Sequence, residues 1–381
     1  MKRGTVYCVG VMLALVCVAL WLEPAWADKL ADAIAKTPKG TEVGQINDQA
    51  PTGYLGIPGA PSVNMLVAFF WAIWVGWIFS SVGAFGGVMA GVGHITIFGI
   101  GNYGATFRKT APELNKLITD TIRTANQWLG GTSAAISSLN YWRMGRLVLP
   151  LGLSLGAGSV VGSFLVPWLT AGKISFKAYV GYFGLFVLFL GCFLLYQTLP
   201  MVRDKNKKAK EAAKAFEASV KQQREGGQVD FKEQGVKLKK FTLSKVTFTF
   251  FGVEFSFNPF VPAIGGFFIA CVASFLGVGG GFLLVPFLTA AAGLPMYLAA
   301  GTSAFAVLVG MITSISTFMG SGVPVHWPLV GMELVGVVVG SMIGPRTSKY
   351  IPDIWLKRIF IVLAFYVGIR YSLRGFFGIQ I

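Results

Sequence analysis

The stretch Gly277-Val-Gly-Gly-Gly281, which continues through Phe-Leu-Leu-Val to Pro286, lies inside an apolar run over residues 263–292. A glycine inside a helix costs about 1 kcal/mol relative to alanine, so four glycines in five positions predict a broken helix. Within a bilayer such a break is tolerated only where the freed N–H and C=O groups face protein or a water-filled cavity. We therefore expect a ligand site on its four glycines, which are Gly277, Gly279, Gly280 and Gly281.

Composition places this break in a membrane protein. The 381 residues are 54% hydrophobic and only 13% charged, against about 25% charged in a soluble domain. Apolar runs of roughly 20 residues recur along the chain, which predicts an all-α polytopic fold. The net charge of +16 comes mainly from loops between these runs. The preference of basic residues for the cytoplasmic side explains it better than a nucleic-acid partner.

The amino-terminal region has the pattern of a secretory signal peptide. Lys2 and Arg3 precede an apolar core, and Ala25 and Ala27 form a small-residue cleavage pattern before Asp28. Residues 1–27 are thus predicted to be removed, the alternative being a retained first helix. Residues 28–62 then form an extracytoplasmic arm with one short helix over 30–36, and the protein lies in the inner (plasma) membrane.

Two membrane regions flank a basic linker. The first, residues 63–199, opens with an apolar stretch over 63–100 and then has a polar interval, which we interpret as an exposed loop with an amphipathic helix over 111–128. Residues 200–260 form a lysine-rich cytoplasmic linker with a solvated helix and, over 247–257, a small hairpin or an interfacial segment. The second membrane region is 261–381. Further spans are expected at 128–141, 147–169, 178–199, 261–292, 297–319, 328–343 and 355–371.

The two membrane regions carry the same landmarks in the same order. Gly131-Thr-Ser-Ala134 recurs as Gly301-Thr-Ser-Ala304, Val161-Gly-Ser163 recurs as Val339-Gly-Ser341, and Gly91-Val-Gly93 matches Gly277-Val-Gly279. Repeated halves are common in secondary transporters. If each glycine-broken segment is a pair of short helices, each half has five segments and the halves are inverted. The arm and the chain end then share one side, and the linker lies on the other.

Candidate site residues follow from this repeat. The first half contributes Gly91 and Gly93, whose alternative role is close helix packing. Hydroxyl donors are Thr132, Ser133, Thr302 and Ser303, which also suit backbone bonds within a helix. His94 is placed to bind an oxyanion or a proton, or simply to pack. Glu333, an acid inside a predicted span, is the candidate for proton coupling unless it lies at a helix end.

Other chemistry finds little support. The two histidines and four cysteines form no CxxC or Cys/His cluster, so no metal, disulfide or cofactor is expected. Serine-nucleophile, zinc-protease and paired-aspartate motifs are absent, and we expect no enzyme.

The pattern at Gly277 to Pro286, followed by Ala300-Gly-Thr-Ser303 and duplicated across the linker, resembles the sulfite exporter (TauE/SafE) family of membrane permeases. The resemblance covers residues 63–371 apart from the linker. In the first half His94-Ile95 stands where Gly-Gly is expected. The resemblance implies export of a sulfur-containing anion, such as sulfite or a sulfonate, driven by the proton gradient. An anion channel and a nontransporting assembly or sensory partner remain alternatives, and a homo-oligomer is left open.

Overall fold

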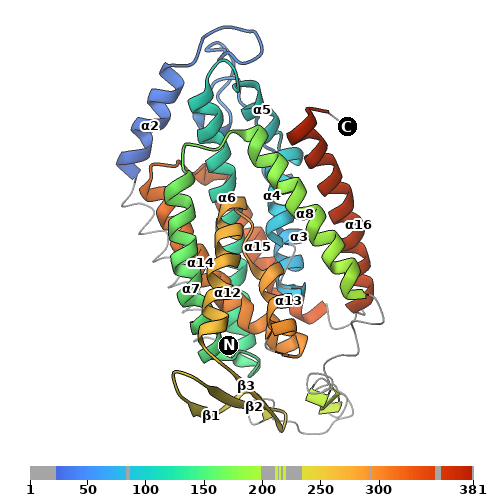
Figure 1. The fold of residues 1–381 in the computed structure, drawn as a ribbon. Coiled ribbons are helices and arrows are strands. Elements are labelled where there is room, and N and C mark those ends of the chain that lie inside the picture. Colours follow the sequence, from blue (N-terminus) through green and yellow to red (C-terminus); the bar gives the residue numbers. More distant parts are fainter. Residues whose placement is uncertain are drawn as a thin grey trace.

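The computed structural model of the chain describes residues 23–82, 86–198, 211–212, 214–215, 218–219, 234–291, 293–347 and 353–379. Long helices form a bundle with a small sheet at one end (Figure 1). We call this end the sheet end. The opposite end, called the arm end, carries α2 (Glu23–Ala35), α5 (Ile100–Thr106) and the carboxyl terminus of the chain. Residues 1–22 lie outside the described residues, so signal cleavage stays a prediction.

The helices follow the order that hydropathy predicts. Before the linker they are α3 (Met65–Val82), α4 (Gly86–Val92), the π-helix η2 (Gly93–Ile97), α5, α6 (Pro112–Arg143), α7 (Leu149–Thr170) and α8 (Phe176–Thr198). After it they are α12 (Phe260–Leu276), α13 (Gly281–Ala291), α14 (Met296–Gly320), α15 (Trp327–Thr347), α16 (Asp353–Ser372) and the π-helix η4 (Leu373–Phe377). A 3-10 turn, η1 (Tyr54–Gly56), lies in the arm.

The predicted break in the second half is confirmed. Gly277 ends α12 in the left-handed conformation with φ 70°, and Gly279 follows with φ 68°. The chain then folds back, since Gly280 lies against Ala273 and Gly265 lies against the Phe287 ring. Because α13 runs back along α12, the two helices form a helical hairpin.

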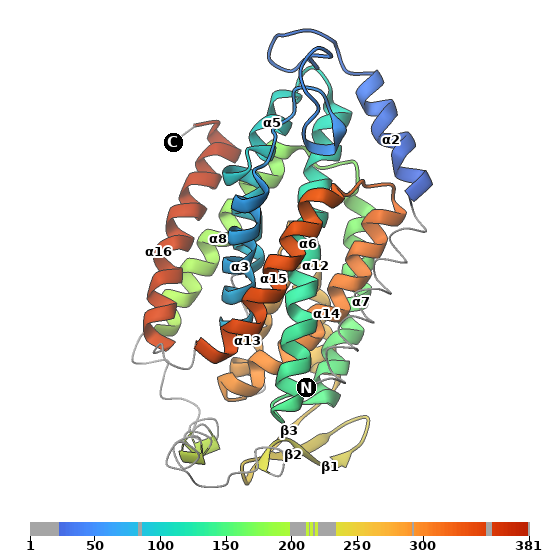
Figure 2. The same cartoon turned by 180° about the vertical axis from the view of Figure 1, so that it is seen from behind.

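A second hairpin joins α3 to α4. Gly86 lies against Phe79, and further along the Trp71 indole donates a hydrogen bond to the Met89 carbonyl at 3.1 Å. The hairpins begin at opposite ends, because α3 follows the arm and α12 follows the sheet (Figures 1 and 2). Their tips meet inside the bundle, where Gly87 lies so close to the Val278 carbonyl that a side chain on Gly87 would overlap it.

Glycine seams hold each hairpin against a helix of the other half. Along α15, Gly336 and Gly340 lie on the backbone of α3, and along α7, Gly158 and Gly162 lie on the backbone of α12. Glycines at four-residue spacing let helix backbones approach closely, and in a bilayer such packing replaces the hydrophobic effect as the source of helix association. Both seams are therefore expected to stabilise the fold.

Four helices of the described residues are long and apolar enough to cross a membrane: Leu149–Thr170, Phe176–Tyr196, Leu298–Gly320 and Trp327–Gly344. Shorter apolar helices, Met65–Ser81, Gly86–Ile97 and Phe260–Leu276, belong to the hairpins. Large apolar side chains on the outer faces are exposed, as on α7 with Phe164 and Trp168. Such faces suit contact with lipid rather than water.

The prediction of an exposed loop in the polar interval before Gly131 is wrong. A single helix, α6, runs through both the expected amphipathic segment 111–128 and the expected short span 128–141. Its side chains Asp120, Arg123, Asn126 and Gln127 are completely buried. These side chains bond to one another and to neighbouring helices. The sequence pattern of such buried polar residues is the same as that of residues exposed to solvent, so the pattern alone cannot distinguish the two.

The predicted hairpin over residues 247–257 is confirmed, and a third strand joins it. Strands β1 (Lys237–Phe241), β2 (Val246–Phe250) and β3 (Val253–Phe257) pair antiparallel in the order β1-β2-β3. The first strand lies in what was predicted to be solvated linker, and all of its side chains are exposed. Phe248 and Phe250 of β2 are buried in the apolar cluster that also holds Leu288 of α13.

Candidate functional site

His94 and Glu333, predicted separately, form one buried pair. His94 lies on η2 and Glu333 on α15, both are fully buried, and the His94 Nε2 atom lies 3.1 Å from Glu333 Oε2. The His94 Nδ1 atom lies 3.0 Å from the Ala90 carbonyl and 2.8 Å from Asn126 Oδ1. Since a carbonyl can only accept, Nδ1 carries a hydrogen. Nε2 and Oε2 can therefore form a hydrogen bond only if one of the two atoms carries a further proton.

This pair belongs to a buried polar network in which hydrogen-bonding capacity is left unused. Glu333 Oε1 is buried and has no hydrogen-bond partner. Buried polar groups are normally bonded, and an unpaired one costs about 1–3 kcal/mol. An unpaired carboxyl oxygen beside a shared proton is typical of a functional site rather than of a structural core.

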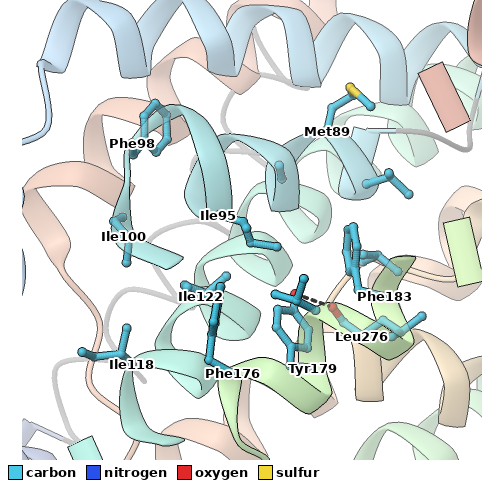
Figure 3. Packing of buried hydrophobic residues seen from close by; sticks show 14 of the residues in the cluster. Met89, Ile95, Phe98, Ile100, Ile118, Ile122, Phe176, Tyr179, Phe183 and Leu276 are labelled. Carbon is cyan, nitrogen blue, oxygen red and sulfur yellow. Dashed lines mark hydrogen bonds between the residues drawn. The ribbon is translucent and has the colours of Figure 1, made fainter. Parts of the chain in front are cut away.

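The network reaches the tip of the second hairpin. The Tyr179 hydroxyl of α8 donates a hydrogen bond to the Leu276 carbonyl at 3.0 Å (Figure 3) and also interacts with the Asn126 side chain. Gln127 Nε2 lies 3.5 Å from the Ser274 carbonyl. Donors from α6 and α8 thus bind the carbonyls that end α12, and they link the proton pair to the glycine break.

Arg123, which sequence reasoning missed, sits at the same tip. Its Nη1 donates to Asp120 Oδ1 at 2.7 Å, and its Nη2 donates to the Ser274 carbonyl at 3.2 Å and to Thr170 Oγ1 at 3.1 Å. Both charged side chains are fully buried. Their spacing of three residues on one polar helix was a usable signal, but it was overlooked because the segment was interpreted as a loop.

A small cavity lies beside Gly280. Its volume is about 10 Å³, roughly the room that one water needs. Ser159 and Ser163 of α7 line it with Ser274 of α12, and the Ser274 hydroxyl donates to Ser163 Oγ at 3.1 Å. The glycine break thus borders a small space between α7 and the second hairpin that is lined by apolar side chains and three serine hydroxyls.

The predicted hydroxyl groups lie in helix contacts. Ser133 shares a 2.7 Å hydrogen bond with Ser341 of α15, which ties α6 to α15. Thr302 accepts from the Val148 N–H at 3.2 Å, and Ser303 donates to the Ala300 carbonyl at 3.0 Å. Thr132 is buried on α6. In this structure Ser133, Thr302 and Ser303 all form hydrogen bonds with other groups of the protein.

Gly91 and Gly93 lie within helices and not at the start of α4, and their role as ligand-binding glycines stays a prediction. Gly91 lies in α4 against Phe183, and Gly93 lies in η2 against Trp71. α3 ends at Val82 and α4 begins at Gly86, and Gly87 is the glycine that meets the other tip. The three-letter match to Gly277-Val-Gly279 was too short to set the register.

The arm covers this site from the arm end. Tyr54 of η1 is buried, and its hydroxyl interacts with the Thr121 side chain of α6. Its ring lies 5.0 Å from that of His326, and the Leu55 N–H donates to His326 Nδ1 at 3.1 Å. Over the described residues, His, Cys, Asp and Glu side chains form no group of three that could hold a metal ion.

Two glycine-tipped hairpins meeting inside an apolar helical bundle define a polytopic membrane protein with a buried polar centre. The family model of the sulfite exporter TauE/SafE matches residues 68–371, and the chain belongs to this family. Membership makes it a membrane transporter of sulfite-type anions. No curated protein and no solved structure matches the chain.

Proposed function

We propose that the chain is a secondary transporter that exports a small sulfur-containing anion, such as sulfite or a sulfonate, across the inner membrane by alternating access coupled to protons. One observation carries this proposal: two helical hairpins begin at opposite ends of the bundle and touch at Gly87 and Val278. Broken helices that meet near the centre of a bundle are the usual site of substrate and coupling ions in transporters with repeated halves.

Reciprocal contacts support an inverted repeat. Gly131 of α6 lies against Met311 of α14, and Gly301 of α14 lies against Tyr141 of α6. If Gly131 corresponds to Gly301, residue 141 corresponds to 311, so each contact is the image of the other. The exchanged seams of α3 with α15 and α12 with α7 fit the same relation. Alternating access then consists of one half rocking against the other.

The anion is proposed to bind at the glycine break of the second hairpin. Gly280 borders the cavity, and the hydroxyls of Ser159 and Ser274, which here donate to Gly266 and Ser163, would turn to the anion. The cavity has room for about one water, which is less than an oxyanion of four or more heavy atoms requires. We therefore infer a closed form, in which binding needs α7 and the second hairpin to move apart around the cavity.

The His94 and Glu333 pair is proposed to carry the coupled proton. Its geometry holds one exchangeable proton in a site without water contact. Losing that proton would set an unprotonated imidazole nitrogen against a carboxylate, which is repulsive. The presence or absence of this proton can thus favour one packing arrangement of the helices over another.

The test is flux into proteoliposomes. Radiolabelled sulfite, sulfate, thiosulfate and methanesulfonate are compared with and without a proton gradient. We expect saturable, gradient-dependent flux of one anion. Gly280→Leu should abolish it, because even a Cβ on Gly280 would lie 2.9 Å from Ile269. Gly320→Ala, where a Cβ meets open space, is the matched control.

Glu333→Gln tests the coupling separately. The amide keeps the shape of the carboxyl group but cannot exchange a proton with His94, so downhill flux should persist while its dependence on the gradient disappears. Unsaturable flux that ignores the gradient in the parent protein would indicate a channel instead. Absence of flux for all four anions, from folded protein, would contradict the proposed function.

A further inference from the structure

Arg123 is a buried cation that the proposed proton pair does not use. Within the part of the chain that the structure describes, it is the one Arg or Lys side chain that is completely buried. Burying a charge is costly unless it is paired and hydrogen bonded. The Arg123 guanidinium is paired with Asp120, but the pairing is incomplete, since Arg123 Nε has no partner.

The hydrogen bonds around Arg123 allow an exchange of partners. Gln127 lies one turn further along α6, and its Oε1 also lacks a partner. Asp120 has a second bond that does not involve Arg123, because its Oδ2 accepts the Gly172 N–H at 2.6 Å. Phe318 and Phe275 lie 4.6 and 5.5 Å from the guanidinium carbon. Asp120 can therefore stay satisfied if the guanidinium turns to another anion.

Position also favours Arg123 as an anion ligand. A Cβ on Gly277 would lie 2.8 Å from Arg123 Cα, so the start of the glycine break is packed directly on this residue. The carbonyls that end α12 carry the negative end of the helix dipole. An anion arriving there would be repelled unless a cation offsets that charge, and Arg123 already donates to the Ser274 carbonyl among them.

We propose that the Arg123 guanidinium is the charged ligand of the transported oxyanion, and that Asp120 holds this guanidinium while no anion is bound. The fork of N–H groups matches two oxygens of a small oxyanion. In the closed form the same guanidinium joins α6 to Thr170 at the end of α7 and to the tip of α12. Its transfer to the anion releases these contacts and lets the second hairpin move.

This inference rests on the proposed function, and equilibrium binding tests it. Purified full-length protein in lipid nanodiscs is titrated with ³⁵S-sulfite, with sulfate, thiosulfate and methanesulfonate as competitors at constant ionic strength. We expect Arg123→Gln to weaken binding by about tenfold or more, as the loss of a charged hydrogen bond requires. Arg123→Lys should recover part of the affinity, and Asp120→Asn should tighten binding because the competing carboxylate is gone.

Two further variants keep the test decisive. Arg123→Gln alone leaves a buried carboxylate unpaired, so the neutral pair Arg123→Gln/Asp120→Asn is measured beside it. Arg143→Gln removes the same charge from an exposed position on α6 and should bind as the parent does.

The outcomes separate the inference from the function. If the parent binds an anion and the neutral pair binds it equally well, the role of Arg123 is overturned and the transporter stands. Weaker binding in Asp120→Asn would contradict the exchange. If the parent binds none of the four anions, the proposed function fails and this inference fails with it.

Discussion

The two hairpins share a plan but differ in what surrounds their tips. At the second tip, Arg123 and Gln127 of α6 and Tyr179 of α8 reach the terminal carbonyls of α12. At the corresponding end of α3, the Tyr141 hydroxyl donates a hydrogen bond to the Ser80 carbonyl at 3.3 Å. The proton pair, in contrast, uses η2 of the first hairpin. A buried cation thus lies beside the second hairpin and the proton pair beside the first, although Arg123 and His94 both precede the linker.

Their outer coverings differ as well. The arm covers the first hairpin through buried residues such as Ile46, Tyr54 and Ile57, which belong to the same apolar cluster as Ala68 and Ala72 of α3. The sheet covers the second hairpin through Phe248 and Phe250. Each hairpin is thus closed at the end where it begins, and by a different kind of structure.

The largest expected effect is at the contact between the tips. Gly87→Val should destabilise the protein by about 3 kcal/mol or more, because its side chain meets the Val278 backbone, which cannot yield as a side chain can. Gly279→Ala should cost only about 1–2 kcal/mol, from its φ of 68°, since its new methyl meets the flexible end of Met311. Denaturant unfolding in mild detergent measures both.

Gly331→Ala is the control for these variants, because it lies in α15 where a Cβ meets nothing within 4 Å. It should leave the unfolding midpoint unchanged or raise it slightly. A Gly87→Val protein as stable as this control would mean that the tips do not touch in the membrane.

The glycine seams should show effects of intermediate size. Gly158→Ala on α7 and Gly340→Ala on α15 each push a methyl into a facing backbone carbonyl, of Ala263 and of Ile73. We expect a loss of about 2 kcal/mol for either. Equal losses of unfolding free energy in the same assay would support the proposal that the two seams are equivalent. A loss confined to one seam would contradict it.

The smallest expected effect concerns the arm over the first hairpin. Burial lowers the pKa of His326 below its ordinary value of 6.5, and the neutral ring accepts the Leu55 N–H. A protonated ring cannot accept this bond, and protonation is easier when the arm is released. Docking should therefore be strongest above about pH 6.5 and weaken by about 1 kcal/mol as the pH falls below it.

Hydrogen exchange of the Leu55 amide, corrected for its intrinsic pH dependence, measures this docking at pH 7.5 and pH 5.5. His326→Gln keeps an acceptor that does not titrate, so its exchange should not change with pH. An equal response in parent and variant would show that His326 does not control the arm.

Much of the fold could be predicted because it depends on local patterns. Apolar length located α7, α8, α14 and α15 to within a few residues, and the glycine cost located the end of α12 at Leu276. The register of the first hairpin could not be predicted in this way. One short glycine match favoured Gly91 and Gly93, whereas the contact that matters is made by Gly87.

The site was predicted only in part. His94 and Glu333 were each recognised as unusual polar residues in apolar surroundings, but they are 239 positions apart, and no local pattern joins them. Arg123 and Asp120 were missed because a polar run has the same appearance whether it faces water or other polar groups. Only the packing of α8, α12 and the α7 to α8 connection around α6 distinguishes the two cases.

The sequence alone determined that this chain is a polytopic helical membrane protein, that its helix breaks at Gly277, and that it resembles the sulfite exporters. These properties follow from hydropathy, from the conformational cost of glycine and from short motifs, all of which act within a few residues. Only the tertiary structure decided which polar groups meet. A buried charge or a shared proton is stable only with partners from distant helices, and their positions are set by how the two halves pack together.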